Sequence, residues 1–188
     1  MATFDDLRAA VLPGARWLAA GPDTAPSTAT TLDLAWVRLL RPRLPAFDVL
    51  ERGDVAVVPR ADLVMAAPDP VSLAALADEC VTAGIGGIVL VGEGSADADE
   101  LVGVAARAGL PVLDAGPGDA TAIERSAIGF LVNHRAELER QATLLETRLE
   151  QVALGGGGPE GLAAAIAAFL GRPVAIEGRG GATLAVHV

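Results

Sequence analysis

Short apolar runs alternate with amphipathic stretches along the first 118 residues of the chain. This alternation is typical of an α/β fold, in which a mostly parallel sheet is flanked by helices. It predicts about five short strands, over residues 15–19, 34–39, 55–58, 88–91 and 111–113. The fourth of these runs is apolar at every position, which predicts a strand buried on both faces.

Helices are predicted between these strands from apolar spacing and from the residues that favour helix ends. The best marked begins with Asp69 as N-cap and Pro70 at the first helical position, and it ends at Gly84. Its expected inward face, at the spacing of a packed helix, consists of Leu73, Leu76, Ala77 and Cys80. Short helices are expected over residues 4–12 and 44–51. Another is expected from Ser95 or Asp97 to Gly109, with an inward face of Leu101, Val104, Ala105 and Ala108.

Residues 119–152 are predicted to form one long, coiled-coil-like helix. Apolar residues recur there every seven positions, as in the seam of a coiled coil, although Arg135 interrupts the pattern. We call the large apolar members the heptad positions: Ile128, Leu131, Leu138, Leu145, Leu149 and Val152. They predict a homodimer interface, and the alternative is that the helix packs back on its own domain.

A partial α+β segment follows the long helix. Gly155 to Gly158 predict a break, and Pro159 opens an amphipathic helix that ends near Leu170. Residues 174–177 and 183–188 predict a hairpin. Because one helix and one hairpin bury little apolar surface, we expect the chain to end inside a second domain. The predicted divisions are an α/β domain over 1–118, a long helix over 119–154, and a hinge with the start of another domain over 155–188.

Composition limits the classes of partner. The net charge is −10, so the chain as a whole repels nucleic acid. All its basic residues are arginines, a bias typical of genes of high GC content such as those of actinomycetes. Neither a signal peptide nor an apolar run long enough to span a membrane is evident, so we expect a cytoplasmic protein without a membrane partner.

Residues suited to catalysis are sparse. Cys80 is the only cysteine, and the two histidines, His134 and His187, have no neighbouring partner motif. We interpret His134 as a solvated residue on the long helix. No group of residues has the spacing of metal ligands. We therefore expect no enzyme activity, no metal and no cofactor, although a small α/β enzyme remains the less favoured alternative.

A ligand site is predicted where the strands end. In open parallel sheets, ligands bind in the crevice beyond the carboxyl ends of the strands. The residues expected there are Arg38, Arg41, Arg60, Gly92, Glu93, Gly94 and Asp114. Arginines bind planar anions through paired hydrogen bonds, and glycines allow approach to backbone N–H groups, so a carboxylate, phosphate or purine-derived acid is expected. The alternative is that these residues form ordinary solvated turns.

Several motifs in order resemble the PucR family of bacterial transcription regulators, a group that includes regulators of purine catabolism and of the CdaR type. They are Leu-Glu-Arg-Gly-Asp-Val-Ala-Val at 50–57, Ala-Gly-Ile-Gly-Gly-Ile-Val-Leu at 83–90, Ala-Gly-Leu-Pro-Val-Leu at 108–113, and Leu-Val-Asn-His-Arg at 131–135. Phe-Leu-Gly-Arg-Pro-Val at 169–174 is similar to the start of the GAF-like domain that many members carry next.

The resemblance implies an N-terminal sensory domain that binds a small metabolite and relays the signal through the long helix. DNA would be bound only through a C-terminal helix-turn-helix that these residues do not contain. This chain departs from the family at Pro59-Arg60-Ala61, where a Thr-Thr-Gly-like stretch is common, and at Gly116-Pro117-Gly118, where aromatic residues are common. Ligand identity is therefore not implied. A scaffold or dimerisation module that senses nothing is the alternative.

Overall fold

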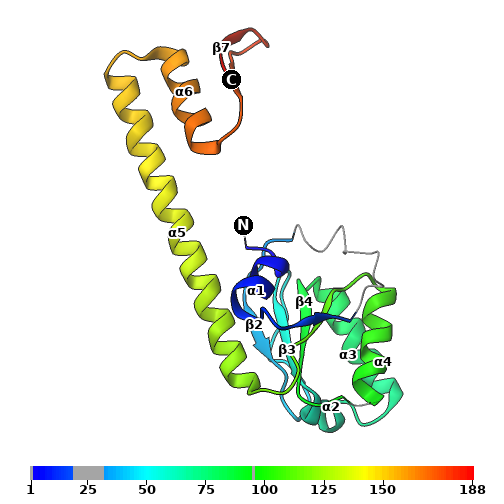
Figure 1. The fold of residues 1–188 in the computed structure, drawn as a ribbon. Coiled ribbons are helices and arrows are strands. Elements are labelled where there is room, and N and C mark those ends of the chain that lie inside the picture. The colour runs from blue at the N-terminus through cyan, green and yellow to red at the C-terminus, as the bar shows by residue number, and fades with distance from the viewer. Residues whose placement is uncertain (1, 19–31, 95) are drawn as a thin grey trace. The chain divides into compact units, whose positions relative to one another are not determined.

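The computed structural model describes residues 2–18, 32–94 and 96–188 of the chain. These residues divide into two compact units, Met1–Arg135 and Ala136–Val188. The first unit is an α/β sheet with helices on both faces, and the second is a helical and hairpin unit (Figure 1). The α/β class, the mostly parallel sheet and the long helix predicted from the sequence are confirmed.

Five strands form the sheet of the first unit, in the order β1-β5-β4-β3-β2. The strands are β1 (Arg16–Trp17), β2 (Val37–Leu39), β3 (Val55–Pro59), β4 (Gly87–Val91) and β5 (Val112–Asp114). Four of them are parallel, and β1 pairs antiparallel with the edge of β5. The carboxyl ends of β2, β3, β4 and β5 therefore lie along one edge of the sheet.

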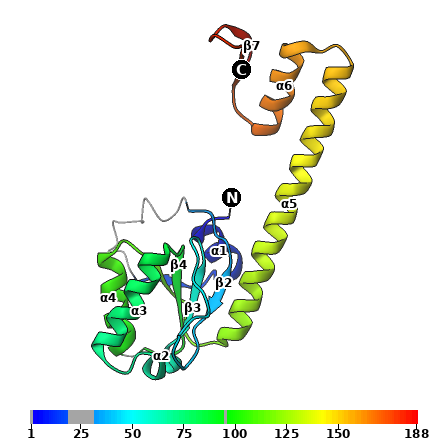
Figure 2. The same ribbon diagram turned by 180° about the vertical axis from the view of Figure 1, so that it is seen from behind.

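Helices cover both faces of this sheet (Figures 1 and 2). One face carries α2 (Arg60–Ala66), α3 (Pro70–Ala83) and α4 (Ala96–Arg107). The other carries α1 (Phe4–Val11) and the first turns of α5 (Ala120–Leu154), which contribute Ala127 and Leu131 to the core. The sheet is thus the middle of three layers, and its strands are buried on both sides, as the apolar run of β4 predicted.

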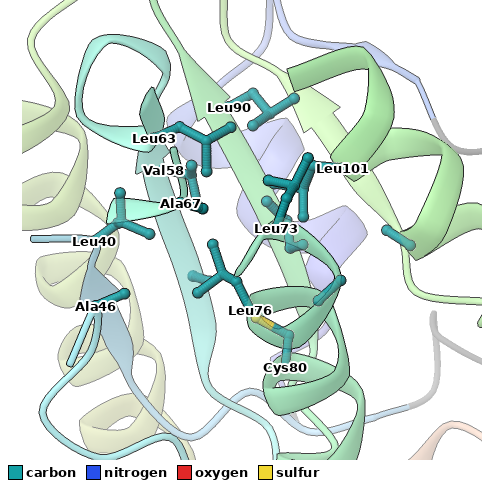
Figure 3. Close-up of a cluster of buried hydrophobic side chains, with 14 of the residues drawn as sticks. Leu40, Ala46, Val58, Leu63, Ala67, Leu73, Leu76, Cys80, Leu90 and Leu101 are labelled. Carbon is teal, nitrogen blue, oxygen red and sulfur yellow. The ribbon is translucent and has the colours of Figure 1, made fainter. Parts of the chain in front are cut away.

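Successive strand residues alternate between two cores because side chains along a strand point to opposite faces. Ala56, Val58, Ile88, Leu90 and Val112 join the cluster under α2, α3 and α4. The intervening residues Val55, Val57, Val89, Val91 and Leu113 join the cluster under α1 and α5. Figure 3 shows the first cluster, where Leu63, Leu73 and Leu101 from three helices meet Leu90 of β4.

Helix α3 forms where its capping residues predicted. The Asp69 side chain accepts hydrogen bonds from the N–H groups of Val71 and Ser72, each at 2.9 Å. Pro70 occupies the first turn, where its missing N–H costs nothing. Gly84 ends the helix with φ of 67°, a left-handed conformation that glycine adopts without strain. The predicted inward face of Leu73, Leu76, Ala77 and Cys80 is buried.

Several predicted elements differ in the structure. The helix predicted over 44–51 is absent: residues 42–48 form bends and 49–51 are irregular, because Pro45 lacks an N–H and Arg41 N–H bonds to Ala46 O across the turn. The strand predicted over 34–39 begins only at Val37, since Ala35 N–H bonds to Gly53 O instead. Ala108 lies beyond α4 and is exposed. The predicted turn at 21–27, Ala19 and Ser95 lie outside the described residues.

The second unit contains the C-terminal part of α5, helix α6 (Gly158–Leu170) and a hairpin of β6 (Val174–Glu177) and β7 (Thr183–His187). The predicted break after α5 and the predicted hairpin are both confirmed. Its buried apolar residues are small ones: Ala163, Ala167 and Ala185. None of the helices in the described part of the chain combines the length and the apolar content that crossing a bilayer requires.

Candidate ligand-binding site

A cavity of about 540 Å³ lies at the carboxyl ends of β3 and β4. These ends are neighbours because Pro59 pairs with Val91 in the parallel register. Two more elements complete the walls, namely α2, which begins directly after β3, and the first turn of α5. The lining residues are Leu39, Pro59, Arg60, Ala61, Asp62, Val64, Val91, Gly92, Glu93, Gly118, Asp119, Ala120 and Thr121.

Three of the predicted site residues, Arg60, Gly92 and Glu93, line this cavity. Arg38 and Arg41 instead line a separate hollow of about 270 Å³ beside β2. Gly94 and Asp114 line neither of these two cavities. A cavity therefore lies where the crevice rule predicted a site, but only three of the seven predicted residues line it.

Arg60 is a buried part of the cavity wall, with only 7% of its surface exposed. Its Nη2 lies 3.2 Å from Oδ1 of Asp114, and its Nη1 donates to the carbonyl oxygen of Gly92 at 3.0 Å. Its Nε is buried and has no hydrogen-bond partner in the structure. The guanidinium thus holds β3 and β5 together across β4, and its charge is neutralised by Asp114.

Asp114 lies at the end of β5 and receives further donors. Arg16 Nη2 donates to its Oδ2 at 2.9 Å, and Gly116 N–H donates to its Oδ1 at 2.9 Å. Burial alone would raise the pKa of this carboxyl, but the donors from Arg16 and Gly116 and the charge of Arg60 hold the pKa below its ordinary value. Asp114 is therefore a charged structural anchor beneath the cavity.

The other two predicted arginines are also paired with carboxylates. Arg38 Nε donates to Oδ2 of the fully buried Asp54 at 2.9 Å, and Arg41 makes a bidentate pair with Asp48. The expectation of an anionic ligand assumed free guanidinium groups, and all three of these groups already have carboxylate partners. Sequence inspection alone gives no sign of this, since the partners lie 7 to 54 positions away.

The glycine turn after β4 is closed rather than open to a ligand. Gly92 N–H donates to Gly116 O at 2.8 Å, so this N–H is not free for a phosphate or carboxylate. Its φ of 109° explains the glycine, since side chains rarely tolerate that conformation. The tight-turn interpretation of this segment therefore accounts for Gly92.

The first turn of α5 was missing from the predicted site. Asp119 accepts from Thr121 N–H at 2.9 Å, and this cap places the helix start against the cavity. The change from a Gly-Pro-Gly stretch to a capped helix was visible in the sequence. The closeness of the α5 start to β3 and β4, however, depends on the order of the strands in the sheet, which the sequence does not show.

The heptad positions occupy different surroundings. Leu131 is buried in the first unit's core and Ile128 packs against that core. Leu145 and Val152 line an apolar groove of about 700 Å³ shared with α6. Leu149 is half-buried, while Leu138 is exposed over 41% of its surface. The dimer interface stays a prediction, and Leu138 is the heptad position most open to a partner.

Cys80 and His134, the cysteine and the histidine considered for catalysis, do not line this cavity. Burial raises the pKa of the Cys80 thiol to about 12, so it stays protonated. His134 is half-buried and stacks on Phe130 with ring centroids 5.8 Å apart, which corrects its interpretation as a solvated residue. Among the described residues, no three His, Cys, Asp or Glu side chains gather closely enough to hold a metal ion.

No protein-family model, no curated protein and no solved structure matches this chain. The functional assignment therefore depends on the site and on the sequence motifs described above.

Proposed function

We propose that this chain is the ligand-sensing and dimerisation region of a cytoplasmic bacterial transcription regulator of the PucR type. A small metabolite binds the cavity at the carboxyl ends of β3 and β4. The long helix α5 relays its presence to an effector domain outside these residues. This proposal takes its family from the ordered motifs in the sequence and its mechanism from the cavity.

One observation carries the sensing role: the first turn of α5 forms part of the cavity wall. Gly118, Asp119, Ala120 and Thr121 contribute to the lining, and α5, which is 35 residues long in all, runs from this turn in the first unit to Leu154 in the second. A ligand that contacts this turn acts on one end of a helix that joins both units. A ligand shifts the equilibrium between two conformations of a protein only if it binds one of them more tightly. If the two conformations differ in the position of α5, the cavity wall differs between them, and so does the affinity for the ligand.

Self-association is supported by the apolar surface that α5 leaves exposed. Leu138 and Leu144 are large apolar residues in the part of α5 that belongs to the second unit, and both are exposed. The apolar groove beside them adds to this surface. A second copy of the chain that covers it removes apolar area from water, which is the main driving force of association.

The sensing role is tested by a thermal-shift screen of purine catabolites, amino acids, organic acids and amines. A ligand at 100 times its Kd stabilises the protein by about 2.7 kcal/mol. Ala61→Phe places a ring in the cavity and should abolish the rise in Tm. Ala74→Phe, at an exposed position of α3 outside the cavity, should preserve it. If no compound raises Tm, or if Ala61→Phe leaves the rise unchanged, the cavity is not the sensor site.

Self-association is tested by light scattering on the wild type, Leu138→Asp and Leu154→Asp. Both leucines are exposed, so neither change disturbs a core, and only Leu138 is a heptad position. We expect a dimeric wild type, a monomeric Leu138→Asp and a dimeric Leu154→Asp. A monomeric wild type contradicts the dimer, and equal behaviour of the two variants contradicts its placement at the heptad positions.

We also propose that DNA binding belongs to a helix-turn-helix outside these residues. With a net charge of −10, the chain lacks the basic surface that neutralises phosphates. A mobility-shift assay with this chain should show no sequence-specific complex at physiological salt. A specific complex that survives competitor DNA would contradict the proposal.

A further inference from the structure

The charges around the β3–β4 cavity favour a different ligand class from the one that the arginines suggested. Arg60 is the only basic residue in the lining, and Asp114 already neutralises it at 3.2 Å. A guanidinium in a buried ion pair, also bonded to Gly92 O, has little attraction left for an anion. An incoming carboxylate would have to displace Asp114 from a position that Arg16 and Gly116 also hold.

Three carboxylates line the same cavity: Asp62, Glu93 and Asp119. Asp119 caps α5 through Thr121 N–H. Asp62, on the first turn of α2, and Glu93, after β4, make no hydrogen bond or ion pair within the part of the chain that the structure describes. The lining therefore carries one neutralised positive charge and two carboxylates whose charge is uncompensated.

The walls between these charged groups are apolar. Leu39, Val64 and Val91 lie in the lining with Pro59 and two alanines, so the interior suits a short hydrocarbon frame. The wall also includes a buried donor without an acceptor, Arg60 Nε. Buried polar groups in proteins nearly always have a partner, and this nitrogen, which its neighbours close off, meets an oxygen of a bound molecule when the Arg60 side chain shifts.

We propose that this cavity binds a small organic cation, an amine with a short apolar frame and an oxygen acceptor, whose charge lies against Asp62 and Glu93. The ligand's carbonyl or hydroxyl oxygen accepts from Arg60 Nε after a shift of that side chain. The inference rests on the proposed sensing function and narrows its ligand class. An amine close to two uncompensated carboxylates is attracted by both of them, whereas an acid of the same size is repelled.

Three probes with the same branched frame and the same carbonyl oxygen test the charge directly. They are leucinamide (a cation at pH 7), 4-methylpentanamide (neutral) and 4-methylpentanoate (an anion). Each is titrated into the whole chain up to about 10 mM and followed by amide chemical shifts. We expect leucinamide to shift the signals of residues around the cavity and to bind at least about tenfold more tightly than the other two.

The carboxylates are tested with a matched pair of double variants. Asp62→Asn with Glu93→Gln removes both free charges and should weaken leucinamide binding by about tenfold or more, without improving the neutral amide. Asp78→Asn with Glu79→Gln makes the same chemical changes on the exposed side of α3, outside the cavity, and should leave its affinity within about twofold of wild type.

Each outcome bears on a distinct claim. Tighter binding of 4-methylpentanoate than of leucinamide overturns the cationic class and leaves the cavity as the proposed sensor site. If the two double variants weaken leucinamide binding equally, the cationic class is also overturned. The weakening then comes from the long-range effect of net charge and not from contact with Asp62 and Glu93. If none of the probes shifts the cavity residues, the cation inference fails. The sensor role is then judged separately by the metabolite screen and the Ala61→Phe variant.

Discussion

The two units of this protein bury very different side chains. In the first, large aliphatic and aromatic residues such as Phe4, Leu63, Leu90 and Leu113 are fully buried on both faces of the sheet. In the second, the buried apolar residues are Ala163, Ala167 and Ala185. A buried Leu or Phe contributes about 1.5–3 kcal/mol through the hydrophobic effect, and an Ala contributes much less. The first unit thus has the core of an independent domain, and the second does not.

Exposed apolar residues complete this contrast. Phe169 and Leu170 at the end of α6, and Leu184 and Val186 on β7, are exposed in the second unit. Exposed apolar surface gathered in one place is typical of sites of interaction. The first unit therefore buries its large apolar residues, whereas the second buries small ones and leaves large ones exposed.

The largest effect should come from removing a core side chain of the first unit. Leu90→Ala deletes a fully buried side chain of β4, and the free energy of unfolding should fall by about 2–5 kcal/mol. Leu184→Ala, at an exposed position of the second unit, should change it by less than about 0.5 kcal/mol. Chemical denaturation followed by tryptophan fluorescence and by circular dichroism measures both.

Trp17 and Trp36 both lie in the first unit, so fluorescence reports that unit alone, whereas circular dichroism reports all helices. Leu90→Ala should move the fluorescence midpoint strongly. A loss at Leu184 as large as that at Leu90 would contradict the contrast, since it would mean that the second unit packs as tightly as the first.

The next effect concerns the charged anchor below the cavity. Asp114→Asn keeps the shape and one acceptor oxygen but leaves the buried Arg60 without a neutralising charge. Hydrogen bonds to charged groups contribute about 1.5–3 kcal/mol each, so a loss of about 2–3 kcal/mol is expected at neutral pH. Asp99→Asn, an exposed acid on α4, serves as the control and should have little effect.

The same anchor predicts a pH dependence. Because the folded pKa of Asp114 lies below its ordinary value of 3.8, its contribution to stability is fully present above that value. The contribution is lost as pH falls through the folded pKa. The difference in stability between wild type and Asp114→Asn should therefore be constant from pH 7 to pH 5 and shrink below about pH 4. A difference that stays unchanged down to pH 2 would show that the carboxylate charge is not its source.

Elements with local signals were predictable from the sequence, and those set by distant contacts were not. The Asp69-Pro70 start and the Gly84 end of α3 are local, and so are the apolar run of β4 and the two strands of the hairpin. Helix α2 was not predicted, because it follows β3 without a break and is only seven residues long. The antiparallel pairing of β1 with β5 also had no sequence signal, since its partners are nearly 100 residues apart.

The candidate site divides in the same way. Its location at the carboxyl ends of β3 and β4 followed from the sheet, and Arg60, Gly92 and Glu93 were correctly expected to meet there. The expectation of an anionic ligand assumed unpaired arginines, and whether an arginine is paired is decided by the fold. Asp114 neutralises Arg60 from 54 positions away, and only the fold brings the two together.

A smaller effect tests how tightly the first unit is packed. Gly87 begins β4, and a side chain there would place its Cβ 2.6 Å from the ring of the buried Phe4. Gly87→Ala should therefore destabilise the first unit by about 1–3 kcal/mol, as expected for overpacking. The restoring variant is Gly87→Ala combined with Phe4→Leu, which shortens the clashing ring. If the fluorescence midpoint does not move for the single change, the core near α1 is looser than its burial indicates.

The smallest effect should come from the same substitution in the second unit. At Gly161 of α6, a Cβ would meet Val152 Cγ1 at 2.9 Å, but Val152 is half-buried and borders the open groove, so it has room to move. Replacing Gly by Ala inside a helix stabilises the helix by about 0.5–1 kcal/mol, which offsets the cost of this close contact. Gly161→Ala should thus change the free energy of unfolding, followed by circular dichroism, by less than about 0.5 kcal/mol.

The control is Gly129→Ala in α5, where nothing lies within 4 Å of the added Cβ, so this variant shows the gain in helix stability alone. A loss above about 1 kcal/mol at Gly161, together with a gain at Gly129, would show that the α5–α6 contact is as tightly packed as the sheet and would remove the contrast between the two units.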